Sequence, residues 1–279
     1  MILNLNTISD MIKDKIKRLL YSLVGLSVPN QSLNIFKTLV FNFIAFGIKG
    51  IIYRPVFIYN NVKIYRVGRI IFHCPLKPGL LKIGYADLKS QGVTKFFNAG
   101  TIELYDSASI GGASIVENLG LIILKGMNYI SDGCYIFIRK KLEIGVQSVI
   151  GFHSLIMDSD DHYTVNVENK QVSCNKKEII IGNYNWIACH SYIKKGTKTP
   201  DYLIVASANA LLTKDYTFFP PYSVIGGVPV KLLKSGIRRI FNSSVERELE
   251  QFFKENPSES YYKIDDVADL DEVCCETSL

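Results

Sequence analysis

A short acidic string holds the side chains of this sequence that are best suited to proton transfer. It reads Asp158-Ser159-Asp160-Asp161-His162, and His162 is the only one of the four histidines within it. Imidazole titrates near neutral pH, so His162 could take a proton from an attacking hydroxyl group. A neighbouring carboxylate would hold its tautomer and stabilise the imidazolium. We expect Asp160 to be this partner, with Asp158 as the alternative.

Two other interpretations of the string stay open on composition alone. It could be a solvated acidic loop with an incidental histidine. It could also be a metal site, because its aspartates and His162 are all potential ligands. His153 and His162 lack the spacing of a zinc site with three histidines. We therefore expect no metal.

The cysteines offer a second place for chemistry. Cys189 precedes His190, but adjacent residues of a strand point to opposite faces, so the two cannot form a working nucleophile–base pair. None of the six cysteines forms a CxxC pair. This pattern favours free thiols in a reducing compartment, so we expect a cytoplasmic protein.

A repeat of six residues must position these groups. Aliphatic residues recur at this spacing in three runs: Leu124, Ile130 and Ile136; Ile144, Ile150 and Ile156; and Ile181, Ile187 and Ile193. Small or polar residues lie between them. A period of six with small residues at the corners predicts a parallel β-helix, in which stacked coils bury a continuous aliphatic ladder.

The register of the repeat breaks between Ser159 and Lys177, where the sequence is polar and charged. This segment cannot supply the ladder, so we expect a loop at about 159–177 that is extruded from one coil and carries His162. Such loops in repeat proteins often carry function.

The two ends of the chain lack the six-residue pattern of the repeat. We expect a helical N-terminal extension at 1–55, the β-helix domain at 56–233, and a C-terminal helix with a loose acidic tail at 234–279. A membrane-spanning helix in the apolar stretch 33–59 would have to bury Lys37 or Lys49, which is unfavourable. Packing against the core is the favoured interpretation, and a surface-lying contact with a membrane is the alternative.

Composition excludes some classes of function. The chain has 279 residues, of which 48% are hydrophobic, enough for one main domain with extensions. A formal net charge of +6 is far short of a nucleic-acid-binding composition, so we expect no nucleic-acid partner. Anionic small molecules or an anionic membrane surface fit the basic excess better.

Three segments resemble the terminal coils of hexapeptide-repeat acetyltransferases: NWIACHSYIKKG, VASANALLTKD and PPYSVIGGVPVKLLK. The resemblance covers roughly residues 60 to 235. It extends to sugar O-acetyltransferases of the maltose and galactoside type and to those that decorate bacterial polysaccharides. It implies a left-handed parallel β-helix, a homotrimer and acetyl-CoA as donor. The string at 158–162 is similar to the D-x-D-x-H element of this family, whose histidine is the catalytic base.

The resemblance also implies a groove for the cofactor along the last coils. Its expected lining and phosphate-binding residues are Cys189, Ala208, Thr213, Lys214, Lys231 and Lys234. Coenzyme A is long and anionic, so it needs small side chains along its pantetheine arm and cations at its phosphates.

We therefore expect an acetyl-CoA-dependent O-acetyltransferase that acts on a sugar hydroxyl or glycan, in surface polysaccharide biosynthesis (O-antigen or capsule). It would work in the cytoplasm, and a peripheral contact at the inner face of the membrane is the alternative interpretation of its N-terminal segment. The alternatives are N-acetylation of an amino sugar or nucleotide sugar, and a non-catalytic β-helix scaffold.

Overall fold

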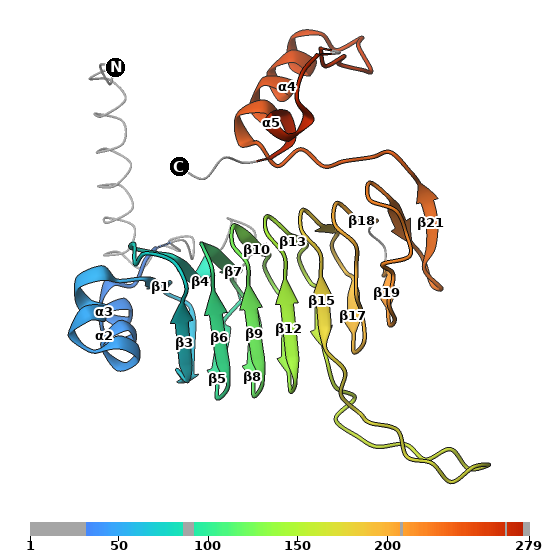
Figure 1. Ribbon diagram of the computed structural model, residues 1–279. Coiled ribbons are helices and arrows are strands. Elements are labelled where there is room, and N and C mark those ends of the chain that lie inside the picture. Colours follow the sequence, from blue (N-terminus) through green and yellow to red (C-terminus); the bar gives the residue numbers. More distant parts are fainter. Residues whose placement is uncertain (1–31, 86–91, 207–208, 266, 276–279) are drawn as a thin grey trace, which may run out of the picture.

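A computed structural model describes residues 32–85, 92–206, 209–265 and 267–275. The first part of the expected helical N-terminal extension, residues 1–31, lies outside these residues. In the described part, short strands form three sheets that make the faces of a long prism (Figure 1). All three sheets are parallel, apart from one antiparallel pair of strands at the C-terminal end of the prism.

The strands follow one another around the prism, so consecutive strands belong to different sheets, except β20 and β21 at the C-terminal end. The first sheet contains β1 Val56–Ile58, β4 Leu81–Tyr85, β7 Ala108–Gly111, β10 Asn128–Ile130, β13 Val149–Ile150, β16 Trp186–Ile187, β18 Ile204–Val205, β20 Val224–Gly226 and β21 Lys231–Lys234. The second contains β2 Val62–Arg66, β5 Thr94–Asn98, β8 Ile115–Asn118, β11 Tyr135–Ile138, β14 Leu155–Met157, β17 Tyr192–Lys194 and β19 Leu211–Leu212. The third contains β3 Arg69–Phe72, β6 Thr101–Leu104, β9 Leu121–Leu124, β12 Lys141–Ile144 and β15 Ile179–Ile181.

The interior of the prism is the predicted aliphatic ladder. Every aliphatic residue of the three six-residue runs is at most 2% exposed. The ladder is in register between coils, for example from Ile130 to Ile150 and on to Ile187. The expected fold class, a left-handed parallel β-helix with helical extensions, is confirmed.

Two helices, α2 Ile35–Phe46 and α3 Ile48–Tyr53, cover the N-terminal end of the coil (Figure 1). The amide of Asn42 in α2 donates to the carbonyl of Val56 and accepts from its N–H, at 2.6 and 3.1 Å. The hydroxyl of Thr38 accepts from the N–H of Ile58 at 3.0 Å. These contacts satisfy the free edge of β1, which would otherwise be open to pairing with another chain. In the described residues, no helix combines the length and apolar character needed to cross a membrane.

The C-terminal extension differs from the expectation. The predicted helix begins only at α4, Ser243–Glu255, where the side chain of Asn242 accepts from the backbone N–H groups of Ser244 and Val245. Residues 237–242 instead run along the β-helix.

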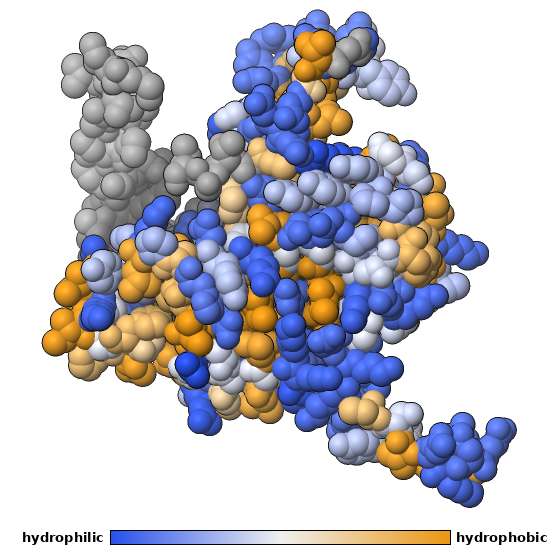
Figure 2. All heavy atoms as spheres, in the orientation of Figure 1, coloured by the Kyte–Doolittle hydropathy of each residue, from blue (hydrophilic) through white to orange (hydrophobic). Residues whose placement is uncertain are grey.

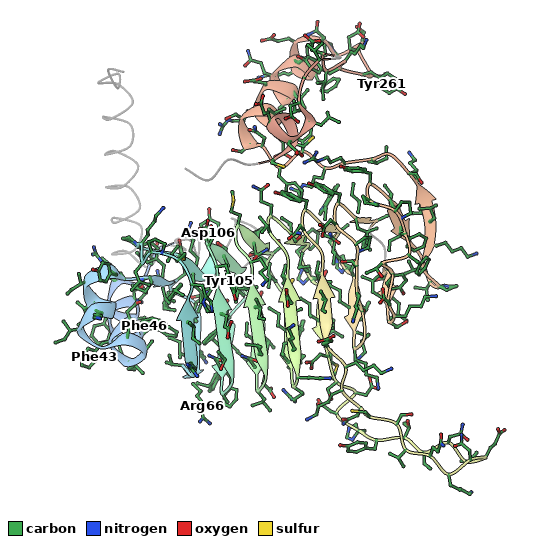
Figure 3. All side chains as sticks on the ribbon, in the orientation of Figure 1. Phe43, Phe46, Arg66, Tyr105, Asp106 and Tyr261 are labelled. Carbon is green, nitrogen blue, oxygen red and sulfur yellow. The ribbon has the colours of Figure 1, made fainter. Side chains whose placement is uncertain are left out.

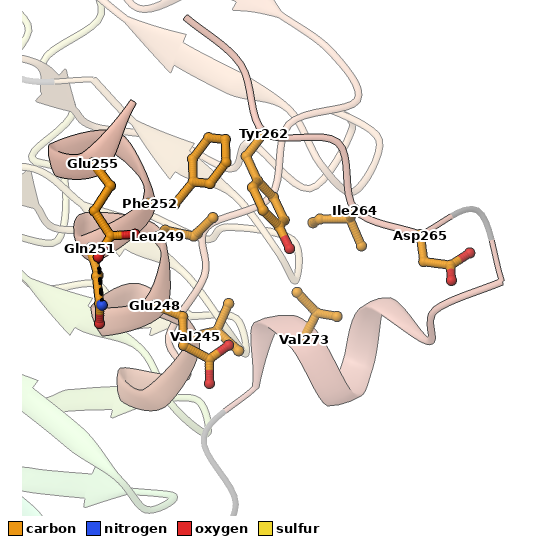
Figure 4. Close-up of a pocket in the computed structure, with 10 residues that line it drawn as sticks. All are labelled: Val245, Glu248, Leu249, Gln251, Phe252, Glu255, Tyr262, Ile264, Asp265 and Val273. Carbon is orange, nitrogen blue, oxygen red and sulfur yellow. Dashed lines mark hydrogen bonds between the residues drawn. The ribbon is translucent and has the colours of Figure 1, made fainter. Parts of the chain in front are cut away.

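The acidic tail is not loose over its described residues. It forms α5, Leu270–Cys274, and folds back onto α4, where the rings of Phe252 and Tyr262 pack with centroids 4.9 Å apart (Figure 4). Apolar side chains of the C-terminal segment make these contacts, although its high proportion of acidic residues had indicated a loose tail.

Candidate active site

His162 lies near the start of an extruded loop that leaves the β-helix between β14 and β15 (Figure 1). Antiparallel bridges join Ser159 to Lys176 and Val165 to Val172, so the loop is a long, irregular hairpin. The His162 side chain is exposed, and within the described residues nothing hydrogen-bonds to it. It is free to meet a ligand or another chain.

Asp158 anchors the base of this loop. Its buried carboxylate accepts three backbone N–H bonds of 2.7 Å, from Arg139, Lys140 and Lys141. It stands at a corner where earlier coils place buried asparagines, among them Asn118. All of its near contacts are with backbone, so the structure favours a structural role for Asp158.

The next two acidic residues also hold the loop base. Asp160 pairs with Lys195 at 2.5 Å, and Asp161 pairs with Arg139 at 3.3 Å. The expected partnership of Asp160 with His162 is not among the contacts of the described residues. Exposed ion pairs are worth little, about 0–1 kcal/mol each, so Asp160 remains able to exchange partners.

A groove of about 550 Å³ lies on the outside of the first sheet, over the last coils. Gly151, Ala188 and Ala206 succeed one another along it, and Cys189 borders it. A Cβ atom at Gly151 would lie 2.4 Å from the Cys189 backbone nitrogen, so only glycine allows the coils to stack there. Small side chains therefore leave the groove open.

Arg239 forms one wall of the groove. Its guanidinium lies over the rings of Trp186 and Phe241, 4.8 and 4.7 Å from their centroids. Burial lowers the pKa of this guanidinium, which nonetheless stays charged at neutral pH. In the described part of the chain no carboxylate forms an ion pair with it. The charge of Glu246 acts on it without a direct ion pair. A half-buried cation that is not held in an ion pair is suited to bind an anion.

The other expected residues fall into two groups. Lys231 and Lys234 are exposed on β21, at the end of the sheet that carries Cys189. Thr213 and Lys214 follow β19 in the second sheet, and the Lys214 ammonium lies 5.8 Å from the ring centroid of Tyr216. They share the corner from which the His162 loop leaves. Ala208 lies outside the described residues.

Comparisons with solved structures find similar coils. The polysialic-acid-specific acetyltransferase NeuO is 16% identical, with 75% of this chain and 91% of that chain covered and a TM-score of 0.47. The polysialic acid O-acetyltransferase OatWY is 20% identical, with 69% and 96% covered and a TM-score of 0.36. The N-acyltransferase AntD from Bacillus cereus, in complex with a dTDP-amino sugar and coenzyme A, is 16% identical, with 72% and 88% covered and a TM-score of 0.40. No family model and no curated protein matches the sequence.

These likenesses concern the course of the coils alone. They do not carry site residues over to this chain, because the identities are low and the superpositions partial. The roles of His162, Asp160 and the groove residues therefore depend on this chain's own geometry.

Trp186 and Arg239 were not expected in the site. Trp186 is 38% exposed on the outer face, while Ile187 points inward. Strand alternation places Trp186 outside once Ile187 is in the ladder, so that signal was available. Arg239 had no such signal, because its position depends on the path of residues 237–242.

Replacing Asp158 or Asp160 with asparagine should change the stability of the protein by different amounts. Asp158→Asn would turn an amide group toward backbone N–H donors and leave buried groups unsatisfied. We expect it to lower the free energy of unfolding by about 2–4 kcal/mol. Asp160→Asn, as the control, should change it by less than about 1 kcal/mol. Chemical denaturation measures both, and equal effects would contradict the structural assignment of Asp158.

Proposed function

We propose that this chain is an acetyl-CoA-dependent O-acetyltransferase that acts on a sugar hydroxyl. The observation that carries the proposal is the pairing of two features on the terminal coils. One is an exposed histidine on an extruded loop. The other is an open groove of small residues with Arg239 in its wall, a cation that forms no ion pair within the described residues. The first suits proton abstraction, and the second suits a long anionic donor.

In the proposed reaction, the acceptor hydroxyl oxygen attacks the thioester carbonyl carbon of acetyl-CoA while His162 takes its proton. The carbon–sulfur bond then breaks, and the coenzyme A thiolate leaves and is protonated. Ion pairing with Asp160 after release from Lys195 would stabilise the imidazolium.

Direct transfer requires no acetyl-enzyme. Cys189 would need a base, and its neighbour His190 packs instead against the rings of His153 and Phe152, at 5.4 and 5.3 Å. His190 has a positive φ of 57° at its corner. We assign Cys189 to lining the groove.

The groove would hold the donor. Ala188, Cys189 and Ala206 would flank the pantetheine arm. Arg239 would meet the phosphates, with Lys231 and Lys234 on β21, two strands beyond the groove in the same sheet. Arginine suits this position because its planar group can stack on aromatic rings and still donate from its edge.

A homotrimer would complete the site. Within one chain, the His162 loop leaves from the corner between the second and third sheets, whereas the groove lies on the first sheet. A three-fold arrangement of prisms would set the loop of one chain against the groove of the next. We propose this shared cleft, with the acceptor sugar between the two walls.

The base assignment predicts a selective loss of rate. His162→Ala should lower turnover by about two to four orders of magnitude, the usual size of a general-base contribution. Coenzyme A affinity should stay near normal, because the loop is not part of the groove. Thiol release from acetyl-CoA with a panel of oligosaccharides measures the rate. Loss of the product's acetyl group in mild base distinguishes an ester from an amide.

His73→Ala is the matched control, because His73 lies toward the other end of the coil and pairs with Glu103. Near-wild-type turnover in His162→Ala would remove this histidine from the mechanism. A base-stable product would instead indicate N-acetylation.

The unpaired cation predicts a change in donor binding. Arg239→Gln should weaken coenzyme A binding by about ten- to a hundredfold, since a charge-assisted hydrogen bond contributes about 1.5–3 kcal/mol. The salt dependence of binding should also decrease. Calorimetric titration at two salt concentrations measures both effects. Arg247→Gln on α4 is the control, and equal affinity in the two variants would place the phosphates elsewhere.

The shared cleft predicts complementation between two inactive chains. His162→Ala lacks the base, and Ala206→Trp fills the groove. Mixed trimers refolded from both should regain activity, because some clefts combine an intact loop with an intact groove. An inactive mixture in which mass spectrometry verifies mixed trimers would assign both walls to one chain. Activity of a strictly monomeric wild-type protein, shown by light scattering, would also contradict the shared cleft.

A further inference from the structure

The helical cap of α2 and α3 has an unusual distribution of polarity. Its inward side carries the buried polar residues Thr38 and Asn42, which bond to the edge of β1. Its outward side carries exposed apolar residues, among them Phe36, 76% exposed, and Ile48, 71% exposed. Further exposed apolar residues of the cap are Ile35, Val40, Phe43, Ile44, Ile51, Ile52 and Tyr53. We call this exposed set the apolar cap.

The apolar cap is contiguous at one end of the molecule. Figure 2 shows hydrophobic residues gathered at the end of the prism where α2 and α3 lie, and Figure 3 shows Phe43 there. Scattered apolar side chains on a surface are ordinary, but a contiguous patch marks an interaction site.

The charged side chains of the described segment that contains the apolar cap are all basic. Between Asp14 and Asp87 the sequence contains no acidic residue. In the described residues 32–85, the charged side chains are Lys37, Lys49, Arg54, Lys63, Arg66, Arg69, Lys77 and Lys82. The Lys37 ammonium is held by the carbonyls of Asn60 and Val62 at 2.8 and 2.9 Å. Lys49 and Arg54 are exposed beside the apolar residues of α3.

We propose that the apolar cap is a peripheral membrane anchor that inserts into the interface of an anionic lipid bilayer. Apolar side chains with basic neighbours fit the boundary between acyl chains and negatively charged headgroups. With 12 and 6 residues, the helices are too short to span a bilayer, which takes about 20. They would lie in its plane.

The charge also argues against a second copy of the chain as the occupant. Two apolar caps face to face would bring basic side chains together without an acidic residue from the surrounding segment of either chain. An anionic surface neutralises the same charges. In the trimer proposed above, the three caps would share one end, so their membrane contacts would add by avidity. The anchor itself rests only on the cap and does not depend on acetyl transfer.

The test is flotation of the full-length protein with vesicles. The wild type should float with vesicles of phosphatidylcholine mixed with phosphatidylglycerol, and less with phosphatidylcholine alone. A triple variant, Phe36→Ser with Ile44→Ser and Ile48→Ser, should lose at least about tenfold in vesicle affinity. Lys49→Gln with Arg54→Gln should reduce binding to the anionic vesicles and its sensitivity to salt. The matched control is Tyr261→Ser, because Tyr261 is 87% exposed on the C-terminal extension (Figure 3).

Three results would overturn the proposal. The first is wild-type protein that floats with neither kind of vesicle. The second is unchanged flotation of the triple variant with a lower melting temperature, which would mean that another part of the chain covers the cap. The third is a triple variant that loses its oligomeric state, which would make the cap an interface between copies. Activity measured on a soluble acceptor reports separately on acetyl transfer, so the two proposals can fail independently.

Discussion

The stacking of identical aliphatic positions inside the prism is the constraint on which the rest of this structure depends. Each coil buries one rung, such as Ile150, between the rungs of its two neighbours, here Ile130 and Ile187. A shift of one of these residues out of register would expose the side chains stacked on both sides of it. Inward positions therefore admit little besides aliphatic side chains, and variation is confined to corners, outer faces and ends. All of the candidate functional groups lie in those three places.

A long loop can leave a corner only if the two ends of the loop remain bound to the coils. Here the carboxylate of Asp158 binds the start of the loop, because it accepts hydrogen bonds from three consecutive backbone N–H groups of the preceding coil. Ion pairs of Asp160 and Asp161 then steady the loop base. The first residue of the acidic string, Asp158, therefore joins the loop to the coils. The side chain of the last, His162, is exposed and forms no hydrogen bond within the described residues.

The C-terminal segment packs on the outer faces of the coils through aromatic and charged side chains. Tyr184, Tyr202 and Tyr222 stack on successive coils, and the Arg238 guanidinium lies 4.6 Å from the ring centroid of Tyr202. Arg238 also pairs with Asp271 of α5 at 2.6 Å, so one side chain joins the tail to the β-helix. This contact fixes the path on which Arg239 reaches the groove.

The sequence alone determined the fold class, the interior ladder and the extruded loop, because period-six burial and its interruption are local patterns of residue type. It also located His162, since a histidine in an acidic break is visible without coordinates. Only the tertiary structure distinguished Asp158 from Asp160, and only it brought Arg239 to Trp186 and Cys189. It also revealed that α2 turns Thr38 and Asn42 inward beside Phe41, and exposes most of its other apolar residues. These features depend on which backbone groups and distant segments meet in space, and the spacing of residues along the chain does not encode that.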